Sequence, residues 1–160
     1  MRHSEIVIHK QTRTLLLYLA ARVARTYTIA LGRNAAVDKA VEGDQATPVG
    51  EFYICAKNPR SKYFLSMCIS YPNAEDAARG LAAGLISPVE HAEILAAIRL
   101  RKMPPQRTKL GGEIYIHGQG AAQPNCQLKD WTHGCIALGN PAMQELYDSV
   151  TIGTPVLITA

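Results

Sequence analysis

Features that would place the chain in several familiar classes are absent from its 160 residues. No apolar run approaches the roughly 20 residues that a membrane-spanning helix needs, because "TLLLYLAARV" is interrupted by Arg22. The opening "MRHSEIVIHKQTRT" is polar and alternates like a β-strand, so we expect no signal peptide in it. We therefore expect no stable membrane insertion, and an export signal would have to be removed or lie outside these residues.

The four cysteines form no CxxC pair and no dense disulfide framework. Cys55 and Cys68 lie in strand-like runs, where a small buried hydrophobic residue is the favoured interpretation. Cys126 and Cys135 lie in or beside a polar region that contains glycine, and these two have scope for chemistry. The stretch "HGQGAA" fails the dinucleotide-binding pattern because its glycine spacing is incomplete. Repeats, low-complexity segments and linkers are also missing, which indicates a single domain over residues 1–160.

The charge of the chain is modest and unevenly distributed. Charged residues make up 19% of the sequence, and the formal net charge is +4. Residues 1–70 carry ten Lys or Arg and five Asp or Glu, whereas residues 71–160 carry seven and eight, so the two halves have net charges of +5 and −1. This bias suits a small anionic substrate or a polyanionic wall better than sequence-specific DNA binding, although an ordinary solvated surface explains it equally well. We expect no nucleic-acid partner.

The first seventy residues have the composition of β-strands. Runs rich in β-branched and aromatic residues alternate with turn-prone links. They predict strands at residues 5–9, 14–19, 23–31, 51–57 and 63–70. The connection from 32 to 50 is long and charged and contains "GDQATPVG", which predicts a surface loop.

A helical pattern follows the strands. In "SYPNAEDAARGLAAG", Asn73 stands at an N-cap position and Gly84 ends the helix. In "SPVEHAEILAAIRLRKMPP", Ser87 is the N-cap and Glu90 completes a capping box, before two prolines stop the helix. The pattern predicts a helical hairpin inserted at about residues 73–102.

The remainder of the chain returns to β-structure. The segments 113–118, "GCIAL" and "GTPVLIT" predict strands, and a short helix capped by Asn140 and Pro141 is expected at about 141–150. The predicted fold class is mainly β (α+β), a β-sandwich or barrel with helices packed on it or inserted into it.

A histidine and a cysteine in the C-terminal half have the spacing of a catalytic pair. His117 ends one predicted strand, and Cys135 begins another 18 residues later, so the connecting loop can bring them side by side. An imidazole that takes the proton of a thiol, whose reference pKa is about 8.5, makes the activated nucleophile of cysteine acyl-transfer enzymes. A third group must orient the imidazole, and a backbone carbonyl at Gly118, where the chain can turn, is expected to do so.

The glycine before Cys135 adds a second element. Gly134 permits a tight backbone, in which the amides of Gly134 and Cys135 would point at one spot and form an oxyanion hole. Thr132 and Trp131 are candidates for the lining of the same pocket.

Each of these residues also has a plainer interpretation. His117 alone would be a half-buried residue at a strand end, and Cys135 alone would be a packing thiol. A metal site of His117, Cys126, His133 and Cys135 has suitable ligand types but lacks the short paired spacings of structural zinc sites. A Cys126–Cys135 disulfide is a further alternative, and it would silence a nucleophile.

The residues around this pair resemble a known family. "TPVGEFYI", "IYIHG" and "THGCIAL", followed by "GTPV", together resemble the L,D-transpeptidases with the YkuD-type catalytic domain. The family pattern is a histidine, a spacer and then Ser/Thr-His-Gly-Cys, and the resemblance spans essentially the whole chain. The helical insertion and "DWTHGCIAL" look most like the YafK-like murein transpeptidase subgroup.

The resemblance implies a YkuD-like fold and cysteine-dependent acyl transfer on peptidoglycan stem peptides. Cys135 would be the nucleophile, His117 the base and Gly118 the source of the orienting carbonyl, while His133 and Gly134 would flank the oxyanion site. The thiolate would attack the carbonyl on the L-centre of diaminopimelate, expel D-alanine and leave a thioester for an amine acceptor. No metal or organic cofactor is implied. The resemblance also implies acylation by carbapenems and a periplasmic or cell-envelope location.

Two alternatives accompany this interpretation. Release of the thioester to water would make the protein a peptidoglycan amidase or L,D-carboxypeptidase, and a non-catalytic wall-binding module is the rival from another class. The family commonly has an arginine two positions after the cysteine, where this chain has Ala137, so the contact of that arginine with a substrate carboxylate does not carry over. A further hypothesis makes residues 73–102 a lid over the acceptor side of the site.

Overall fold

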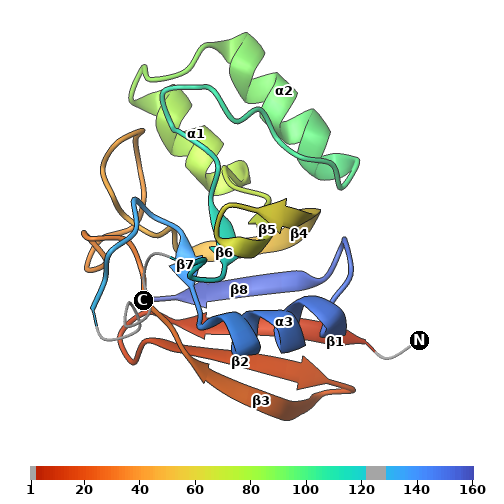
Figure 1. The fold of residues 1–160 in the computed structure, drawn as a ribbon. Coiled ribbons are helices and arrows are strands. Elements are labelled where there is room, and N and C mark those ends of the chain that lie inside the picture. Colours follow the sequence, from red (N-terminus) through yellow and green to blue (C-terminus); the bar gives the residue numbers. More distant parts are fainter. Residues whose placement is uncertain (1–2, 122–128) are drawn as a thin grey trace.

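One curled sheet forms the body of the protein (Figure 1), for which a computed structural model describes residues 3–121 and 129–160. The described residues form eight strands in the order β3-β2-β1-β8-β4-β5-β6-β7. The strands are β1 (Ser4–His9), β2 (Thr14–Leu19), β3 (Arg22–Thr28), β4 (Gly50–Ser61), β5 (Phe64–Ile69), β6 (Tyr115–His117), β7 (Ile136–Ala137) and β8 (Pro155–Thr159). The pairing is antiparallel except between β1 and β8 and between β6 and β7.

The sheet curls because β4 pairs with a different neighbour along each half of its length. Its first residues, from Gly50 to Tyr53, pair with β8, whereas Ile54 and the residues beyond it pair with β5. At the outer edges, Ala30 just after β3 exchanges two backbone hydrogen bonds of 2.9 Å with Ala137 in β7. This bridge joins the two ends of the strand order, so the sheet forms a half-barrel. The predicted mainly β fold class is confirmed.

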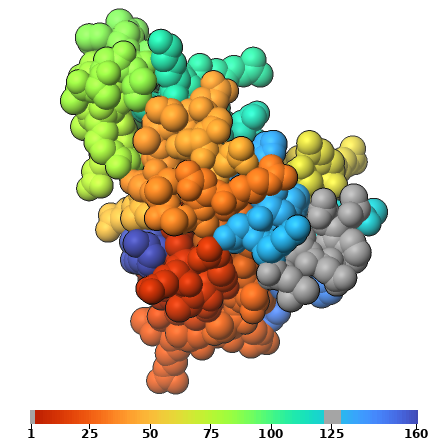
Figure 2. Space-filling view, turned by 90° about the vertical axis from the view of Figure 1, so that its left-hand side faces the viewer, coloured from red at the N-terminus to blue at the C-terminus, as the bar shows by residue number. Residues whose placement is uncertain are grey.

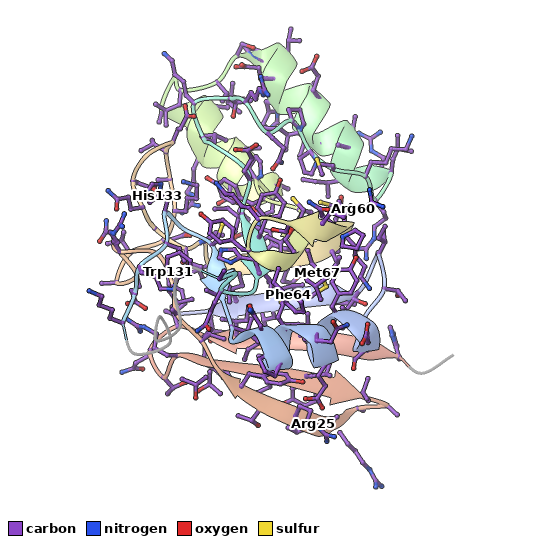
Figure 3. All side chains as sticks on the ribbon, viewed as in Figure 1. Arg25, Arg60, Phe64, Met67, Trp131 and His133 are labelled. Atoms are coloured by element: carbon purple, nitrogen blue, oxygen red, sulfur yellow. The ribbon has the colours of Figure 1, made fainter. Side chains whose placement is uncertain are left out.

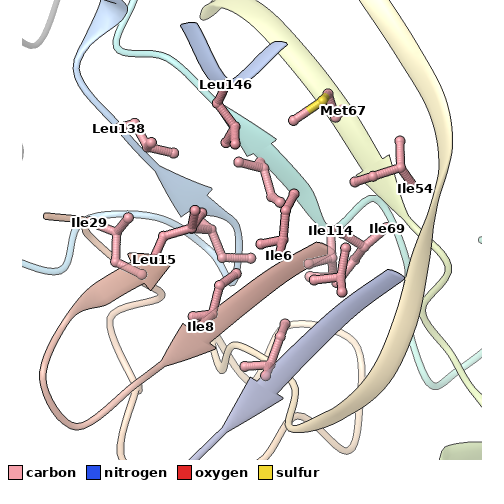
Figure 4. Packing of buried hydrophobic residues seen from close by; sticks show 14 of the residues in the cluster. Ile6, Ile8, Leu15, Ile29, Ile54, Met67, Ile69, Ile114, Leu138 and Leu146 are labelled. Carbon is pink, nitrogen blue, oxygen red and sulfur yellow. The ribbon is translucent and has the colours of Figure 1, made fainter. Parts of the chain in front are cut away.

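The main core lies inside the curl of the sheet. In β1, Ile6 and Ile8 are fully buried and alternate with more exposed neighbours, because successive side chains of a strand point to opposite faces. Leu15 from β2 and Leu146 from α3 (Asn140–Ser149) belong to the same cluster (Figure 4). Burying each such side chain stabilises the fold by about 1.5–3 kcal/mol.

The helical insertion is a separate unit on one side of the sheet. α1 (Ala74–Ala82) and α2 (Pro88–Arg99) lie between β5 and β6 in the chain and stand well away from β1, β2 and β3 (Figure 1). Both predicted N-caps are present: Asn73 Oδ1 accepts from the amide of Asp76, and Ser87 Oγ accepts from that of Glu90. The predicted capping box at Ser87 is confirmed, and the structure adds a second box at Asn73. The insertion has its own small core, made of Ala77, Ile86, Ile94 and Leu110. None of the helices that the structure describes is long and apolar enough to cross a membrane.

Several element boundaries differ from the expectations, and β6 and β7 are shorter than the segments predicted for them. β3 ends at Thr28, and the residues expected to extend it make the bridge to β7 instead. β4 continues to Ser61, since its second half has a partner in β5. The last helix begins at Asn140, with Gly139 as its N-cap, so the predicted capping by the Asn140 side chain is wrong. That side chain bonds to the loop after β6 instead.

Lys57 fastens β4 to the C-terminal end of α3. Its Nζ donates to the carbonyls of Tyr147 and Val150, at 2.7 Å each, and lies 4.0 Å from the Tyr147 ring centroid. The last carbonyls of a helix have no partner within the helix and carry partial negative charge, so an ammonium group there is favourable.

We expect Lys57→Met to lower the free energy of unfolding by about 1–3 kcal/mol, because two carbonyls lose a charged donor. Urea denaturation measures this loss. Lys109 is exposed, so Lys109→Met is the control and should change the unfolding free energy by less than about 0.5 kcal/mol. Equal losses in the two variants would contradict the fastening role.

Candidate active site

His117 and Cys135 line one cavity of about 480 Å³, although 18 positions separate them in the chain. The parallel pairing of β6 with β7 sets Ile116 opposite Ile136, which brings the end of β6 beside the residue that precedes β7. Most of the remaining wall belongs to the β4–β5 hairpin, and Tyr115 and Met103 complete the lining. The sheet topology thus brings the two predicted residues together.

The His117 ring is held by three neighbours. Its Nδ1 lies 2.6 Å from the carbonyl oxygen of Gly118 and donates to it, and this tautomer leaves the lone pair on Nε2. The Tyr63 ring stacks on the imidazole at a centroid distance of 4.5 Å, and the Trp131 ring meets it edge-on at 5.7 Å. The expected carbonyl at Gly118 is therefore in place to orient the imidazole.

Burial keeps the His117 imidazole neutral. Desolvation lowers the pKa of His117 below its ordinary value of 6.5; the bond to the Gly118 carbonyl raises it, and the charge of Lys62 lowers it further. A group whose pKa is lowered stays unprotonated at pH 7, so Nε2 is available as a proton acceptor.

Gly118 is needed because the backbone and the hairpin come very close together. A Cβ at this position would lie 2.7 Å from the carbonyl oxygen of Tyr63 and 2.7 Å from Asn140 Oδ1. The Gly118 amide also donates to the carbonyl of Leu65 at 3.1 Å. The φ of Gly118 is not in the positive range, so the expectation that this glycine serves a turn is wrong. A glycine is needed here because the two backbones approach each other closely.

Asn140 fixes the loop after the histidine. Its Oδ1 accepts hydrogen bonds from the amides of Gln119 at 2.8 Å and Gly120 at 3.2 Å, and its Nδ2 donates to the Gly120 carbonyl at 3.3 Å. Sequence reasoning missed this role because the bonds connect residues 20 or more positions apart, and Asn before Pro at a helix start already had a local explanation as a cap.

The Cys135 thiol is half-buried and forms hydrogen bonds with two backbone groups. Its Sγ accepts from the amide of Tyr115 at 3.4 Å and donates to the carbonyl of Glu113 at 3.4 Å. Desolvation raises the pKa of Cys135 to about 11; the Tyr115 amide opposes this rise, and the nearby Glu113 carboxylate adds to it. Among the described residues no hydrogen bond joins this thiol to His117, so both groups rest neutral rather than as an ion pair.

We expect the alkylation of Cys135 by iodoacetamide to rise about tenfold per pH unit between pH 7 and 10, because the thiolate fraction grows in that way below a pKa of about 11. Peptide mass spectrometry after timed labelling follows this site separately from the other thiols. The urea-unfolded chain is the control and should level off near pH 9. A plateau of reactivity at neutral pH in the folded protein would show a preformed thiolate–imidazolium pair and contradict the prediction.

Thr132 braces the turn that presents the cysteine. Its Oγ1 accepts from the amide of Gly134 at 3.1 Å and donates to the carbonyl of Cys135 at 2.7 Å. Gly134 has a φ of +136°, and a Cβ there would lie 2.8 Å from the carbonyl oxygen of Ala46, so no other residue fits this turn. The Gly134 amide already donates to Thr132 Oγ1, so it does not serve as an oxyanion donor in this geometry. Of the two expected donors, the amide of Cys135 is left.

We expect Thr132→Val to lower the rate at which a carbapenem acylates Cys135 at least tenfold. The turn loses both hydrogen bonds of the hydroxyl, and each is worth about 1 kcal/mol. Thr132→Ser keeps the hydroxyl and should stay within about threefold of the wild type. Stopped-flow acylation kinetics measure both variants. Equal rates for the valine and serine variants would rule out the brace.

The other predicted pocket residues lie around the site rather than within it. Trp131 is half-buried and contacts His117 and Tyr63 edge-on, but its ring does not line the cavity. His133 is exposed and lies at the margin of the molecule (Figure 3), so its expected place beside the cavity is not what the structure has. Thr132 pairs with Gly32, which places residues 129–135 beside the loop that follows β3 (Figure 2).

An ion pair anchors the same loop to the first hairpin. Arg13 donates from Nε to Asp130 Oδ1 at 3.0 Å and from Nη2 to Oδ2 at 2.7 Å. Asp130 Oδ1 also accepts from the Leu31 amide at 3.0 Å. Sequence reasoning missed this pair as well, since 117 positions separate its members.

The remaining thiols do not complete a metal site in the described part of the chain. Cys55, Cys68 and Cys135 are free. Cys68 is buried, as its strand position predicted, whereas Cys55 is only half-buried. No group of three His, Cys, Asp or Glu among the described residues lies close enough to hold a metal ion. Cys126, the remaining member of the metal and disulfide alternatives, lies outside the described residues.

A half-barrel with a buried histidine and a thiol on one cavity has the parts of a cysteine acyl-transfer domain. The family model of the L,D-transpeptidase catalytic domain, YkuD, matches residues 3–158, and the chain therefore belongs to this family. No curated protein sequence matches the chain at a significant level.

Solved structures with the same fold include several bacterial proteins. The helical cell shape determining protein Pgp2 from Campylobacter jejuni is similar at a TM-score of 0.67 and 23% identity, with 98% of this chain and 47% of that chain covered. An L,D-transpeptidase from Mycobacterium smegmatis gives 0.60 and 15%, with 99% and 59% covered. The L,D-transpeptidase LdtMt1, solved in complex with imipenem, gives 0.59 and 16%, with 99% and 59% covered. The chain thus spans about half the length of these proteins.

Proposed function

We propose that this chain is the catalytic domain of a cysteine-dependent L,D-transpeptidase that acts on peptidoglycan stem peptides. The observation that carries the proposal is the presence of His117 and Cys135 on one cavity of a YkuD-family domain. The orientation of His117 by the Gly118 carbonyl adds support, because a base must present a defined nitrogen to the thiol. Peptidoglycan lies outside the cytoplasmic membrane, so the domain would act in the cell envelope.

The neutral resting site implies that proton transfer accompanies attack. The Cys135 thiol turns away from the Glu113 carbonyl and gives its proton to His117 Nε2, and the sulfur bonds to the carbonyl carbon on the L-centre of diaminopimelate. The amide of Tyr115 remains near the sulfur and favours its anionic form. The amide of Cys135 donates to the oxyanion that forms on the substrate in this proposal.

Collapse of the tetrahedral intermediate completes acylation. The protonated His117 gives its proton to the departing nitrogen of D-alanine, the carbon–nitrogen bond breaks, and Cys135 is left as a thioester. An amine of a second stem peptide then gives a proton to His117 and attacks the thioester, which restores the thiol. Each proton that leaves a nucleophile passes through the one oriented imidazole.

Water in the place of the amine would give the hydrolytic counterpart with the same residues. The acceptor decides between the two outcomes. Residues 73–102, the hypothetical lid, do not line the cavity; Met103, directly after them, does. A non-catalytic wall-binding module has less support, because a neutral, oriented histidine and a half-buried thiol on one cavity exceed what binding alone needs.

We expect Cys135→Ala to abolish the covalent adduct with a carbapenem, because the adduct forms on the sulfur. His117→Ala should slow adduct formation by about 10²–10⁴-fold, the usual contribution of a general base. Intact-protein mass spectrometry measures the adduct, and Cys55→Ala is the control that should label fully, because Cys55 is a free thiol that does not line the cavity. Full labelling of the Cys135→Ala protein would contradict the assignment of Cys135 as the nucleophile.

Incubation with purified muropeptides identifies the acceptor. Cross-linked dimers in the chromatogram establish transpeptidation, whereas shortened monomers alone establish the hydrolytic counterpart. Binding of muropeptides without turnover and without reactivity at Cys135 would establish the non-catalytic module.

A further inference from the structure

One wall of the catalytic cavity carries positive charge and no negative charge. Lys57, Arg60 and Lys62 line it, and no Asp or Glu does so among the described residues. Lys57 is occupied by the carbonyls at the end of α3. Arg60 and Lys62 take part in none of the ion pairs of the described residues, and residues 122–128 contain no acid that could pair with them.

The β4–β5 hairpin holds these two cations in a fixed relation to the catalytic pair. Arg60 lies at the end of β4 (Figure 3), and Lys62 lies two positions further on, in the turn that leads into β5. The next residue, Tyr63, stacks on the His117 ring. A Cβ at Gly120 would lie 2.7 Å from the Lys62 carbonyl oxygen, so the hairpin tip is packed tightly on the loop after β6.

The strand after the nucleophile offers no cation to the cavity. Ala137 is fully buried, pairs with His117 across β6 and β7, and exchanges hydrogen bonds with Ala30 on its other side. The nearby cation Arg13 is paired with Asp130. Lys39 lowers the pKa of Cys135 through its charge, but it is paired with Asp44 and does not line the cavity. The cations that line the cavity are therefore all on the hairpin in the described chain.

We propose that Arg60 and Lys62 form a carboxylate subsite that recognises a free carboxylate of the acyl donor next to the scissile carbonyl. The inference rests on the proposed function and names the feature of the donor that this site selects. A guanidinium binds a carboxylate through two parallel hydrogen bonds, and an ammonium beside it adds a point charge. Two groups of the stem peptide have this chemistry: the carboxylate of the terminal D-alanine and that on the D-centre of diaminopimelate.

Carbapenem acylation tests the subsite without peptidoglycan, because a carbapenem carries one carboxylate beside its reactive lactam. We expect Arg60→Ala/Lys62→Ala to lower the second-order rate constant for acylation of Cys135 by about 100-fold, roughly tenfold for each charged contact. The rate constant at saturating carbapenem should change little, since the loss lies in binding. Arg60→Lys with Lys62 retained keeps the charge but loses the bidentate pair, so its rate should fall between those of the wild type and the double variant. Added salt should slow the wild type more than the double variant.

The chain offers a closely matched control. Arg107 and Lys109 are also an exposed Arg and Lys two positions apart, and neither lines the catalytic cavity. Arg107→Ala/Lys109→Ala removes the same charge and should acylate at the wild-type rate. If both double variants slow equally, net charge rather than the subsite is responsible and the proposal is overturned. Thermal melting of each variant checks that the fold is intact.

Amidated stem peptides identify which carboxylate is bound. Tetrapeptides amidated at D-alanine or at the D-centre of diaminopimelate are compared with the free acid; wild-type KM should rise about tenfold for one of them. The Arg60→Ala/Lys62→Ala variant should not distinguish that amide from the acid. Equal KM values for all three peptides in the wild type overturn the subsite. If carbapenem acylates the wild type and the Arg60→Ala/Lys62→Ala variant at the same rate, the subsite alone is refuted. If carbapenem does not acylate the wild type at all, the proposed function is refuted with the subsite.

Discussion

The close approach of the β4–β5 hairpin to the backbone at Gly118 is the constraint on which the site depends. It is held by the hydrogen bond from the Gly118 amide to the Leu65 carbonyl and by the absence of a Cβ that would meet the Tyr63 carbonyl. The same contact stacks Tyr63 on His117, which buries the imidazole and lowers its pKa. It also builds one wall of the cavity, so the base, its electrostatic environment and the space for a substrate have a common structural origin.

The electrostatics of the cavity follow from burial rather than from paired charges. Desolvation lowers the pKa of His117 and raises that of Cys135, and both shifts favour the neutral forms. A neutral thiol reacts slowly with bulk reagents; in the proposed reaction it becomes a nucleophile when a bound carbonyl accepts the electrons and the imidazole accepts the proton. Under that proposal, the arrangement would restrict reactivity to molecules that fit the cavity.

Sequence patterns identified the parts of the fold that have local causes. Asn73 and Ser87 cap their helices as predicted, because a cap involves residues only three positions apart. The His117–Cys135 pair was also visible, since strand ends bound a single loop. The Arg13–Asp130 pair and the clamp by Asn140 were not, because their partners are far away in the sequence and only the closure of the sheet brings them together. The engagement of the Gly134 amide by Thr132 depends on turn geometry that spacing does not encode.

The position of the positive charge is tied to the way the sheet closes. Ala137 is fully enclosed by the bridge to Ala30 and by its pairing with β6. A guanidinium whose stem starts there would have to leave this packed region or lose hydration, and burying an unpaired charge is costly. Arg60 and Lys62 project from an exposed hairpin instead, so they stay hydrated until a carboxylate displaces the water. The small side chain of Ala137 therefore lets the half-barrel close tightly, and the two cations on the hairpin supply the positive charge that attracts an anion to the cavity.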